Sequence, residues 1–438
     1  MFITEHKGAL VFEINNEYVL YNTYTDDFVK IEKNNNFDIS LTAEMEEKFV
    51  KEGIIFEDDF EYNSVSRYMI NKSKYVSNVL QITDALSYNC NLKCVYCMQQ
   101  NIDKKETCLS FIKKVEEWKY LKELFNCCSL NVCLFGGEPF IDLKYVRGLV
   151  NYAKEIDLAD INYTVVTNGT IVNDELINLM NESNFEKIQI TVDGLELTHN
   201  KRRVSNEFNC FSLIIVNLKK LLEKTNIKII INTVIDNNNF EEINDMVNFL
   251  ISEFTEHIFS DEKRIVFNFG MECHPSGKSN YTISSIPNIL DYTKRYYDFL
   301  IEIVRKGIFI SQLFPTPLCI NKVEKDILLA PNGDVFKCIS GLGSNEYLIS
   351  TYDELMTNPM SLFINLSKHI ERYNSPCQCC KYQSLCNGGC YYNSILEDKK
   401  FICSKSILDA TIEDILYLKM ITDVQNDGSY RIKKDFAE

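Results

Sequence analysis

The sequence has few of the features that mark three large classes of protein. Lys and Arg number 46 against 62 Asp and Glu, which gives a net charge of −16. The cations do not gather into a basic stripe, so a partner with a phosphate backbone gains no support. No apolar run reaches the length of a bilayer. The N-terminus, with Glu5, His6 and Lys7, lacks the apolar core of a signal peptide. We therefore expect a cytoplasmic protein that binds neither nucleic acid nor a membrane.

Cysteine, in contrast, is abundant, with 17 residues in a chain of 438. In a small secreted protein this would indicate disulfides, but this chain is large and shows no export signal. Reduced thiolates that bind metal are then the better interpretation. Ten of the cysteines fall in two patterned sets, one beginning at Cys90 and one at Cys319.

The first set is Cys90, Cys94 and Cys97, directly after an apolar run that predicts a buried strand. Three thiolates on one short loop can bind three irons of a 4Fe–4S cluster, which leaves the fourth iron open to a small molecule. The alternatives are a zinc site or buried thiols. Structural zinc takes four ligands, usually from paired CxxC units, so CxxxCxxC without a nearby His fits zinc poorly. We favour an iron–sulfur cluster.

Between residues 78 and 306, short apolar runs alternate with longer amphipathic stretches. The runs predict six strands, at Val79–Leu86, Leu130–Phe135, Tyr163–Thr167, Lys187–Val192, Lys228–Ile235 and Arg264–Phe269. Helical patterns lie between them, at Phe111–Phe125, Tyr145–Ile156, Glu175–Met180, Phe211–Leu222 and Glu241–Phe254. Alternating strands and helices predict a parallel sheet with right-handed crossovers. In a parallel barrel the chemistry lies at the C-terminal ends of the strands, which is where the cysteine loop falls.

Turn motifs follow the next three predicted strands. The second strand runs into Gly136-Gly137-Glu138-Pro139, where two glycines allow the backbone to approach a ligand closely. The third ends in an Asn168-Gly turn, and the fourth in Thr191-Val-Asp193-Gly, followed by His199 and Arg203. Each alone would indicate an ordinary turn or a solvated loop. Their succession after the cysteine loop favours a ligand site.

Together these motifs resemble the signature of the radical SAM enzymes, in which the open iron binds the amino and carboxylate groups of S-adenosylmethionine (SAM). The resemblance implies an α/β fold with a partial (β/α)6 barrel over residues 78–306. It implies that Tyr96 lies near the adenine, that the Gly-Gly-Glu-Pro turn contacts the methionyl ammonium, and that Thr191 lies near the ribose or carboxylate. A direct contact from His199 is not expected. The residues implied in cofactor binding are Tyr96, Gly136, Gly137, Glu138, Pro139, Asn168, Thr191, Asp193 and Arg203.

The second set of cysteines is Cys319, Cys338, Cys377, Cys380, Cys386, Cys390 and Cys403. Their spacing, with Gly333 five positions before the second of them, resembles the seven-cysteine pattern of SPASM domains. Taken alone, the stretch from 377 to 390 would also fit a zinc ribbon. We expect a SPASM domain over residues 307–438, ending in a helix at Ile407–Thr422.

The ligation in that family implies two auxiliary iron–sulfur clusters, of the 4Fe–4S type. One would be bound by Cys377, Cys380, Cys386 and Cys403, and the other by Cys319, Cys338 and Cys390. Two such clusters call for eight ligands, and only seven are assigned. The candidates for the eighth are Cys379, Cys273, water and a substrate thiolate.

Residues 1–75 form a small separate unit in the sequence. Three runs predict strands, at Leu10–Ile14, Tyr18–Tyr21 and Phe28–Ile31. Leu41, Met45 and Phe49 then recur at helical spacing. This order resembles the winged-helix-like modules that bind leader peptides ahead of many peptide-modifying radical SAM domains. A stabilising extension is the alternative. The polar, acidic stretch from Asp58 to Ser77 predicts a linker.

The resemblance implies an enzyme in which an electron from the cluster splits SAM to methionine and a 5′-deoxyadenosyl radical, which takes a hydrogen atom from the substrate. It implies a precursor peptide as substrate, crosslinked through a Cys thioether, and an electron donor such as flavodoxin or ferredoxin. The alternative is an anaerobic sulfatase maturase that forms formylglycine. Those enzymes carry an Asp after the second SPASM cysteine, and here Ile339 offers no base. A non-enzymatic iron–sulfur carrier or scaffold is a third hypothesis. No catalytic base or radical-quenching residue is identified.

Overall fold

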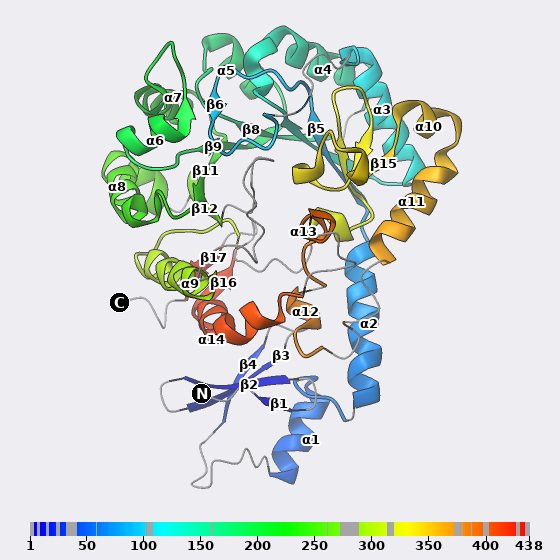
Figure 1. Ribbon diagram of the computed structural model, residues 1–438, viewed down its shortest axis with the longest axis vertical. Helices are drawn as coiled ribbons and strands as arrows, with labels where there is room; N and C mark the ends of the chain where they lie inside the picture. Colours follow the sequence, from blue (N-terminus) through cyan, green and yellow to red (C-terminus); the bar gives the residue numbers. More distant parts are fainter. Residues whose placement is uncertain are drawn as a thin grey trace.

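The computed structural model is organised around one curved sheet with helices on its convex side (Figure 1). It describes residues 4–6, 9–14, 17–22, 27–31, 42–57, 59–100, 102, 108–158, 161–260, 262–271, 289–312, 319–371, 377, 380–386, 388–396, 403–425 and 430–433. The sheet has nine strands in the order β12-β11-β9-β8-β7-β5-β13-β14-β15. Its first seven strands are parallel, which confirms the α/β fold class.

The six predicted barrel strands are all present, within two residues of their expected bounds. They are β5 (Val79–Ala85), β7 (Ser129–Phe135), β8 (Ile161–Thr167), β9 (Phe185–Thr191), β11 (Lys228–Ile235) and β12 (Ile265–Met271). The helices are α3 (Phe111–Leu124), α4 (Leu143–Glu155), α5 (Asp174–Glu182), α6 (Glu196–Arg202), α7 (Cys210–Lys224), α8 (Ile243–Phe259) and α9 (Ile289–Arg305).

Local sequence explains where several of these helices begin. Ser110, Asp142, Asn173 and Asn209 each accept a hydrogen bond from a backbone N–H of the first turn. Such caps satisfy donors that have no partner within the helix. Asp142 and Asn173 lie within seven residues of the strand ends before them, so these two caps fix short loops at that edge of the sheet.

The two faces of the sheet differ in polarity. Residues that point toward the helices are apolar and buried, as Ile188, Ile190 and Ile231 illustrate. Residues on the concave face are largely polar and half-exposed, as Asn131 and Thr164 illustrate. A parallel sheet packed on both faces carries apolar residues on both. The concave face is therefore the wall of a binding space rather than a second core.

The C-terminal third of the chain joins the same sheet. Strand β13 (Asp326–Leu329) pairs in parallel with β5, and β14 (Val335–Phe336) and β15 (Leu348–Ser350) extend the sheet antiparallel. The expected boundary at residue 306 thus does not end the sheet. Further helices follow: α10 (Tyr352–Thr357), α11 (Pro359–Glu371), α12 (Gln383–Cys386), α13 (Tyr391–Leu396) and α14 (Lys405–Ile421). The predicted last helix is thus present, and it packs on α9.

The N-terminal unit is an antiparallel sheet with a helix on one face. Its strands are β1 (Thr4–His6), β2 (Ala9–Ile14), β3 (Glu17–Asn22) and β4 (Phe28–Ile31), in that order, followed by α1 (Ala43–Lys51). Ala9, Val11 and Leu20 form a core with Phe49 of α1. The opposite face, with Phe12, belongs to the main core of the molecule. Both faces are covered, and among the described residues the sheet ends at the edge strands β1 and β4.

The segment expected to link the N-terminal unit to the next, at 58–77, is not an irregular stretch, because Asp59–Tyr75 form helix α2. The helix joins the N-terminal unit to β5 (Figure 1). Its buried positions are Tyr62, Ser66, Ile70 and Lys74, spaced four residues apart. Since half of this stripe is polar, the apolar pattern that indicates a helix is missing from the sequence.

Two short pairs complete the strand inventory. They are β6 (Lys93–Cys94) with β10 (Arg203–Val204), and β16 (Thr422–Val424) with β17 (Tyr430–Ile432). Across the described ranges, no helix has both the length and the apolar character needed to cross a membrane.

A buried polar cluster joins β5, α3 and the turn after β13. Lys114 Nζ donates to Asp84 Oδ1 at 2.8 Å and to the Ala330 carbonyl at 2.6 Å, and Trp118 Nε1 donates to Asp84 Oδ2 at 2.7 Å. Glu117 lies 3.7 Å from the same ammonium. Burial raises the pKa of Glu117 to about 8. Asp84 already balances Lys114, so a second carboxylate charge in this space is unfavourable.

We predict that Glu117→Gln changes the pH dependence of stability. The pKa is about 8 in the folded protein and 4.5 without the fold, so the unfolded chain loses this proton first as pH rises. Stability falls by up to about 1.4 kcal/mol per pH unit between those values and levels off above the folded pKa. Denaturant unfolding of the variant should therefore show a growing advantage over wild type from pH 6 to pH 8.

Glu123→Gln, on the exposed side of the same helix, is the matched control and should show no such trend. An advantage of Glu117→Gln that stays constant with pH would contradict the buried, protonated carboxyl.

Candidate functional site

The cysteine loop leaves the C-terminal end of β5. It pairs with the segment that follows β9, three strands away in the sheet. Cys94 is buried, and its strand β6 pairs antiparallel with β10, which places it opposite Arg203. Val95 N–H also donates to the Arg202 carbonyl at 2.9 Å. The loops after β5 and after β9 therefore form one assembly. Nothing in the sequence pattern indicated this pairing.

Asn168, at the end of β8, contacts the first cysteine. Its Nδ2 lies 3.8 Å from Cys90 Sγ and donates to Asn91 Oδ1 at 2.8 Å. Leu92 N–H points at the same sulfur from 3.4 Å. Burial raises the pKa of Cys90, and these N–H groups oppose that rise. N–H donors that face a sulfur stabilise its thiolate, the form that binds metal.

The loop after β7 lies directly against the cysteine loop. Gly137 N–H donates to Ser87 O, and Glu138 N–H to Asn89 O, both at 2.8 Å. A Cβ on Gly136 would lie 2.4 Å from Ser87 O, and one on Gly137 would lie 2.2 Å from Asn89 O. Gly136 also has a φ of +132°, which side chains disfavour. Both positions require glycine because they pack against this backbone, and the expected approach to a ligand stays a prediction.

Glu138, which follows β7, is buried and accepts hydrogen bonds from residues at the end of β8. Its Oε1 accepts from Thr167 Oγ1 at 2.7 Å and from Phe140 N–H at 3.1 Å, and its Oε2 accepts from Asn168 N–H at 2.8 Å. Burial raises the pKa of Glu138, and these hydrogen bonds oppose the rise. Pro139, also buried, begins the short 3₁₀ turn that follows. Glu138 thus positions Asn168, and this role does not depend on a contact between Glu138 and a ligand.

Asp193 organises the remaining predicted residues at the end of β9. Its Oδ1 accepts from Val234 N–H at 2.9 Å, and its Oδ2 accepts from the Tyr96 hydroxyl. Arg203 Nη1 donates to the same Tyr96 oxygen at 2.7 Å and lies 3.8 Å from Asp193. Burial raises the pKa of Tyr96 well above its usual value, so the phenol keeps its proton. His199 Nδ1 accepts from Asp193 N–H at 3.2 Å.

His199 is buried and accepts from the Asp193 backbone, so it is not the solvated loop residue that the turn alone would indicate. Burial and the neighbouring Arg203 and Arg202 lower its pKa to about 3, so the imidazole is neutral. Arg202 is the residue that the sequence reasoning missed. It pairs with Asp236 at 2.6 Å and lies over the Tyr96 ring, 5.0 Å from the centroid. Its position beside Arg203, at the end of a helix after the Asp-Gly turn, was the available signal.

Thr191 begins a row of polar side chains on the concave wall. Asn232, on the adjacent strand β11, pairs with it in register and places Nδ2 3.4 Å from its Oγ1. Asn268 of β12 in turn donates to Asn232 Oδ1 at 2.7 Å. The C-terminal ends of three neighbouring strands are thus connected next to the cysteine loop.

Four C-terminal cysteines surround one small cavity. Its lining includes Cys377, Cys380, Cys386 and Cys403, the four that were assigned to one cluster. Burial, together with the other three thiolates, raises the pKa of Cys377 to about 11. Cys379, a candidate for the missing ligand, lies outside the described residues, as does Cys273.

Cys319, Cys338 and Cys390 form a second group. Burial raises the pKa of Cys338 to about 11, and both other thiolates act on it in the same direction. Asn321 Nδ2 lies 3.6 Å from Cys319 Sγ. Lys322 is buried, which lowers its pKa, while thiolates of both cysteine groups act against that change. Lys322 therefore lies between the two groups, a placement that the sequence did not indicate.

These arrangements fit iron–sulfur clusters by the chemistry of their donors. Within the part of the chain that is described, no three Cys, His, Asp or Glu side chains are grouped as one metal ion would need. A 4Fe–4S cluster makes a different demand, because each cysteine binds its own iron. The N–H groups that face Cys90 and the cavity lined by four cysteines fit that demand.

A partial parallel barrel with three thiols at the C-terminal mouth defines the class of protein. Residues 85–250 match the family model described as the Radical SAM superfamily. These residues therefore form a radical SAM domain, and the homologues that carry such a domain are enzymes. The family implies a 4Fe–4S cluster and SAM. The contacts of individual residues with them stay predictions.

The chain resembles one curated protein in sequence and two solved structures in fold. It is 27% identical over 335 residues to the cysteine-type anaerobic sulfatase-maturating enzyme of Clostridium novyi (strain NT), covering 70% of this chain and 86% of the relative. Native anSMEcpe with bound AdoMet and Cp18Cys peptide shares the fold at a TM-score of 0.56 and 18% identity, over 78% of this chain and 99% of that one. Streptococcus suis SuiB bound to its precursor peptide SuiA gives 0.54 and 18%, over 93% and 99%.

We predict that Glu138→Gln weakens SAM binding without removing iron. The amide keeps the shape of the side chain but turns a donor toward N–H and O–H groups that also donate, so Asn168 is released. Hydrogen bonds to a charged group are worth about 1.5–3 kcal/mol, which corresponds to a loss of affinity of about tenfold or more. Equilibrium dialysis with labelled SAM measures the loss.

Glu155→Gln, at the exposed end of α4, should bind SAM as the wild type does. If Glu138→Gln bound SAM with unchanged affinity, the carboxylate would not organise the site.

Proposed function

We propose that this enzyme is a radical SAM peptide maturase that forms a crosslink in a ribosomally made precursor peptide, through a Cys thioether. The observation that carries the proposal is the covered N-terminal sheet, attached through α2 to a barrel whose concave wall is polar. SuiB, the neighbour that spans 93% of this chain, is bound to a precursor peptide. The anSMEcpe neighbour holds a substrate-like peptide.

At the mouth of the barrel the residues of the chain have separable tasks. Cys90, Cys94 and Cys97 would hold the cluster, which supplies the electron that splits SAM. The Gly136–Glu138 turn presents backbone close to that loop. Tyr96 and Arg203, fixed by Asp193, close the opposite side and help to exclude water. Flavodoxin or ferredoxin is the proposed electron donor.

The N-terminal unit is proposed to bind the leader of the precursor. Since helix α1 covers one face of its sheet and the body of the molecule covers the other, a peptide can add only along an edge strand, β1 or β4. An edge offers a row of backbone N–H and C=O groups, which is how extended peptides join sheets.

The C-terminal cysteines are proposed to form a SPASM domain with two auxiliary clusters. The group of Cys319, Cys338 and Cys390 has three thiols in the described ranges, and a substrate thiolate is a candidate for its fourth ligand. A thioether then forms as follows. One hydrogen atom would leave the peptide carbon, one proton would leave the thiol, and one electron would leave as the C–S bond forms; an auxiliary cluster held by these cysteines would supply the acceptor for that electron.

Formylglycine formation is the second candidate, because the Clostridium novyi relative is a sulfatase-maturating enzyme. Against it stands Ile339, which follows Cys338 directly and begins a 3₁₀ turn. Its aliphatic side chain cannot accept the proton that aldehyde formation releases.

We predict that the auxiliary clusters are lost separately from the SAM-binding cluster. Replacing Cys377, Cys380 and Cys386 by Ala should lower the bound iron by roughly four atoms, because one cluster loses its site. SAM binding should remain. Iron analysis and labelled-SAM binding on anaerobically reconstituted protein make the comparison. Cys128→Ala, an exposed cysteine outside both groups, should keep full iron content. Equal iron in the triple variant and the wild type would contradict the assignment.

The proposed function is tested by the mass of a candidate precursor peptide after anaerobic co-expression. We expect each crosslink to remove two hydrogens and to protect a cysteine from alkylation. The control is the Cys90→Ala/Cys94→Ala/Cys97→Ala variant, in which the mass should be unchanged. An unchanged mass with active enzyme, while SAM is still cleaved, would reject that peptide and return sulfatase-type substrates to consideration.

A further inference from the structure

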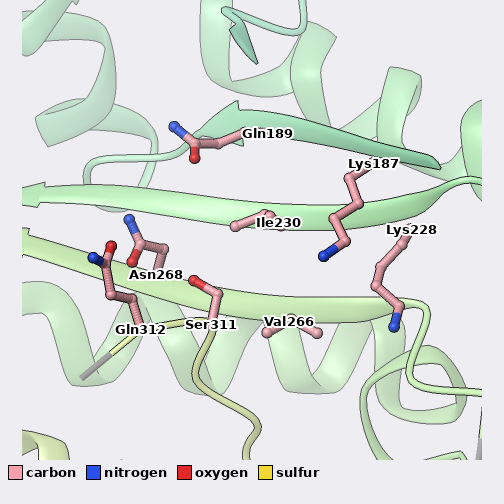
Figure 2. Close-up of a pocket in the computed structure, with 8 residues that line it drawn as sticks. All are labelled: Lys187, Gln189, Lys228, Ile230, Val266, Asn268, Ser311 and Gln312. Carbon is pink, nitrogen blue, oxygen red and sulfur yellow. The ribbon is translucent and has the colours of Figure 1, made fainter. Parts of the chain in front are cut away.

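The cavity in the concave wall of the sheet offers no acceptor for an electron. Figure 2 shows this cavity, of ≈ 340 Å³, with Lys187, Lys228, amide and hydroxyl groups and two aliphatic side chains in its wall. No cysteine, methionine or aromatic residue is among the described residues that line it. In the proposed function, the electron that leaves during thioether formation therefore needs an acceptor elsewhere, and the cysteine groups are the candidates.

Asn321 faces the sulfurs of one of these groups. It is buried in the 3₁₀ turn Ile320–Lys322, which Cys319 begins. Its Nδ2 points at Cys319 Sγ from 3.6 Å. The same side chain is a hydrogen-bond partner of Cys338, where it opposes the rise in pKa that burial causes. Because an amide nitrogen carries two hydrogens, one Asn can serve both sulfurs.

His369 fixes which end of that amide faces the sulfurs. Its Nε2 lies 3.0 Å from Asn321 Oδ1. Since an amide oxygen only accepts, the imidazole donates, and Nδ2 is left for the cysteines. His369 is itself buried on α11, and its ring meets the ring of Tyr391 edge-on, with 4.2 Å between the centroids. Tyr391 directly follows Cys390, so the Asn321–His369 pair contacts all three segments that carry this group.

A purely structural amide makes a different contact. Asn365, one turn before His369 on α11, donates from Nδ2 to the Ile349 carbonyl at 2.9 Å. Asn321 instead directs its donors at sulfur. A neutral thiol is a weak acceptor, whereas a hydrogen bond to an ionised group is about twice as strong as a neutral one. The placement of Asn321 therefore suits sulfurs that carry charge, as metal-bound thiolates do.

We infer that Asn321, held in place by His369, raises the reduction potential of the cluster that Cys319, Cys338 and Cys390 would bind, and thereby suits that cluster to accept the substrate electron. The inference rests on the proposed function, in which the substrate radical loses one electron and the cluster gains it. Reduction makes the cluster more negative, and N–H groups that face its sulfurs stabilise the more negative state. Both residues are positioning residues, which act on the cluster and not on the substrate.

A redox titration followed by electron paramagnetic resonance tests this on the full chain, reconstituted anaerobically. Asn321→Leu keeps the size of the side chain and removes its hydrogen bonds, and His369→Phe removes the donor that orients it. The double variant shows whether the two residues act together. His369→Gln is the conservative variant, because its amide nitrogen can donate in place of Nε2. Asn365→Leu is the matched control on the same helix.

Two further measurements assign the signals. The wave that disappears in Cys377→Ala/Cys380→Ala/Cys386→Ala belongs to the other auxiliary cluster. Iron content shows which variants keep their clusters.

We expect Asn321→Leu to shift the reduction equilibrium of this one cluster about tenfold toward the oxidised form, which lowers its potential by about 59 mV. His369→Phe should shift the potential in the same direction. The double variant should go no further than Asn321→Leu, because His369 acts through Asn321. His369→Gln and Asn365→Leu should match the wild type, and the other clusters should keep their potentials.

An unchanged potential in Asn321→Leu or in His369→Phe, in protein that retains its iron, would overturn the inference. Additive shifts in the double variant would do the same. Loss of this cluster from both single variants would also overturn it, because the pair would then hold the cluster rather than tune it.

The proposed function is judged separately, by the mass of a co-expressed precursor peptide. A crosslinked precursor with an unchanged potential in the variants would reject the inference alone. A shifted potential with an unmodified precursor would count against the proposed function alone. Absence of any cluster at this group in the wild type would reject both.

Discussion

The parallel register of β5, β7, β8 and β9 is the constraint on which the site depends. It brings the ends of four strands to one edge, so loops distant in sequence become neighbours. Short polar contacts then lock them together: Glu138 ties the end of β7 to that of β8, and Arg203 ties the loop after β9 to the cysteine loop. A thiol loop held on both sides keeps its geometry through a change of charge, which is what a redox cofactor requires of its protein.

The same sheet explains why one molecule combines a core and a reaction chamber. Its convex face buries apolar side chains against helices, and that burial stabilises the fold. Its concave face is freed for polar residues, which form the wall next to Thr191 and the cavity with Lys187 and Lys228. Strand β13 continues this sheet on the far side of β5, so the C-terminal cysteines are anchored to the barrel through Lys114 and the Ala330 carbonyl.

The sequence predicts the barrel well because each of its strands is an apolar run bounded by turn residues, as in β11. It predicts the metal and cofactor candidates because glycine and cysteine at fixed spacing have few other uses. The sequence does not predict the structure where the buried side chains are polar. The buried stripe of helix α2 includes the polar residues Ser66 and Lys74, so it does not show as an apolar pattern. Arg202 and Lys322 contact segments that are distant from them in the sequence. No local pattern encodes such contacts.

The central claim is that three cysteines at the barrel mouth hold a cluster with one iron open to SAM. Electron paramagnetic resonance of the reduced enzyme tests it most directly, in a variant that has the seven C-terminal cysteines replaced by Ala, so that one cluster remains. The account predicts a 4Fe–4S signal whose g values change when SAM is added. A signal that SAM leaves unchanged, in protein that retains its iron, would contradict it.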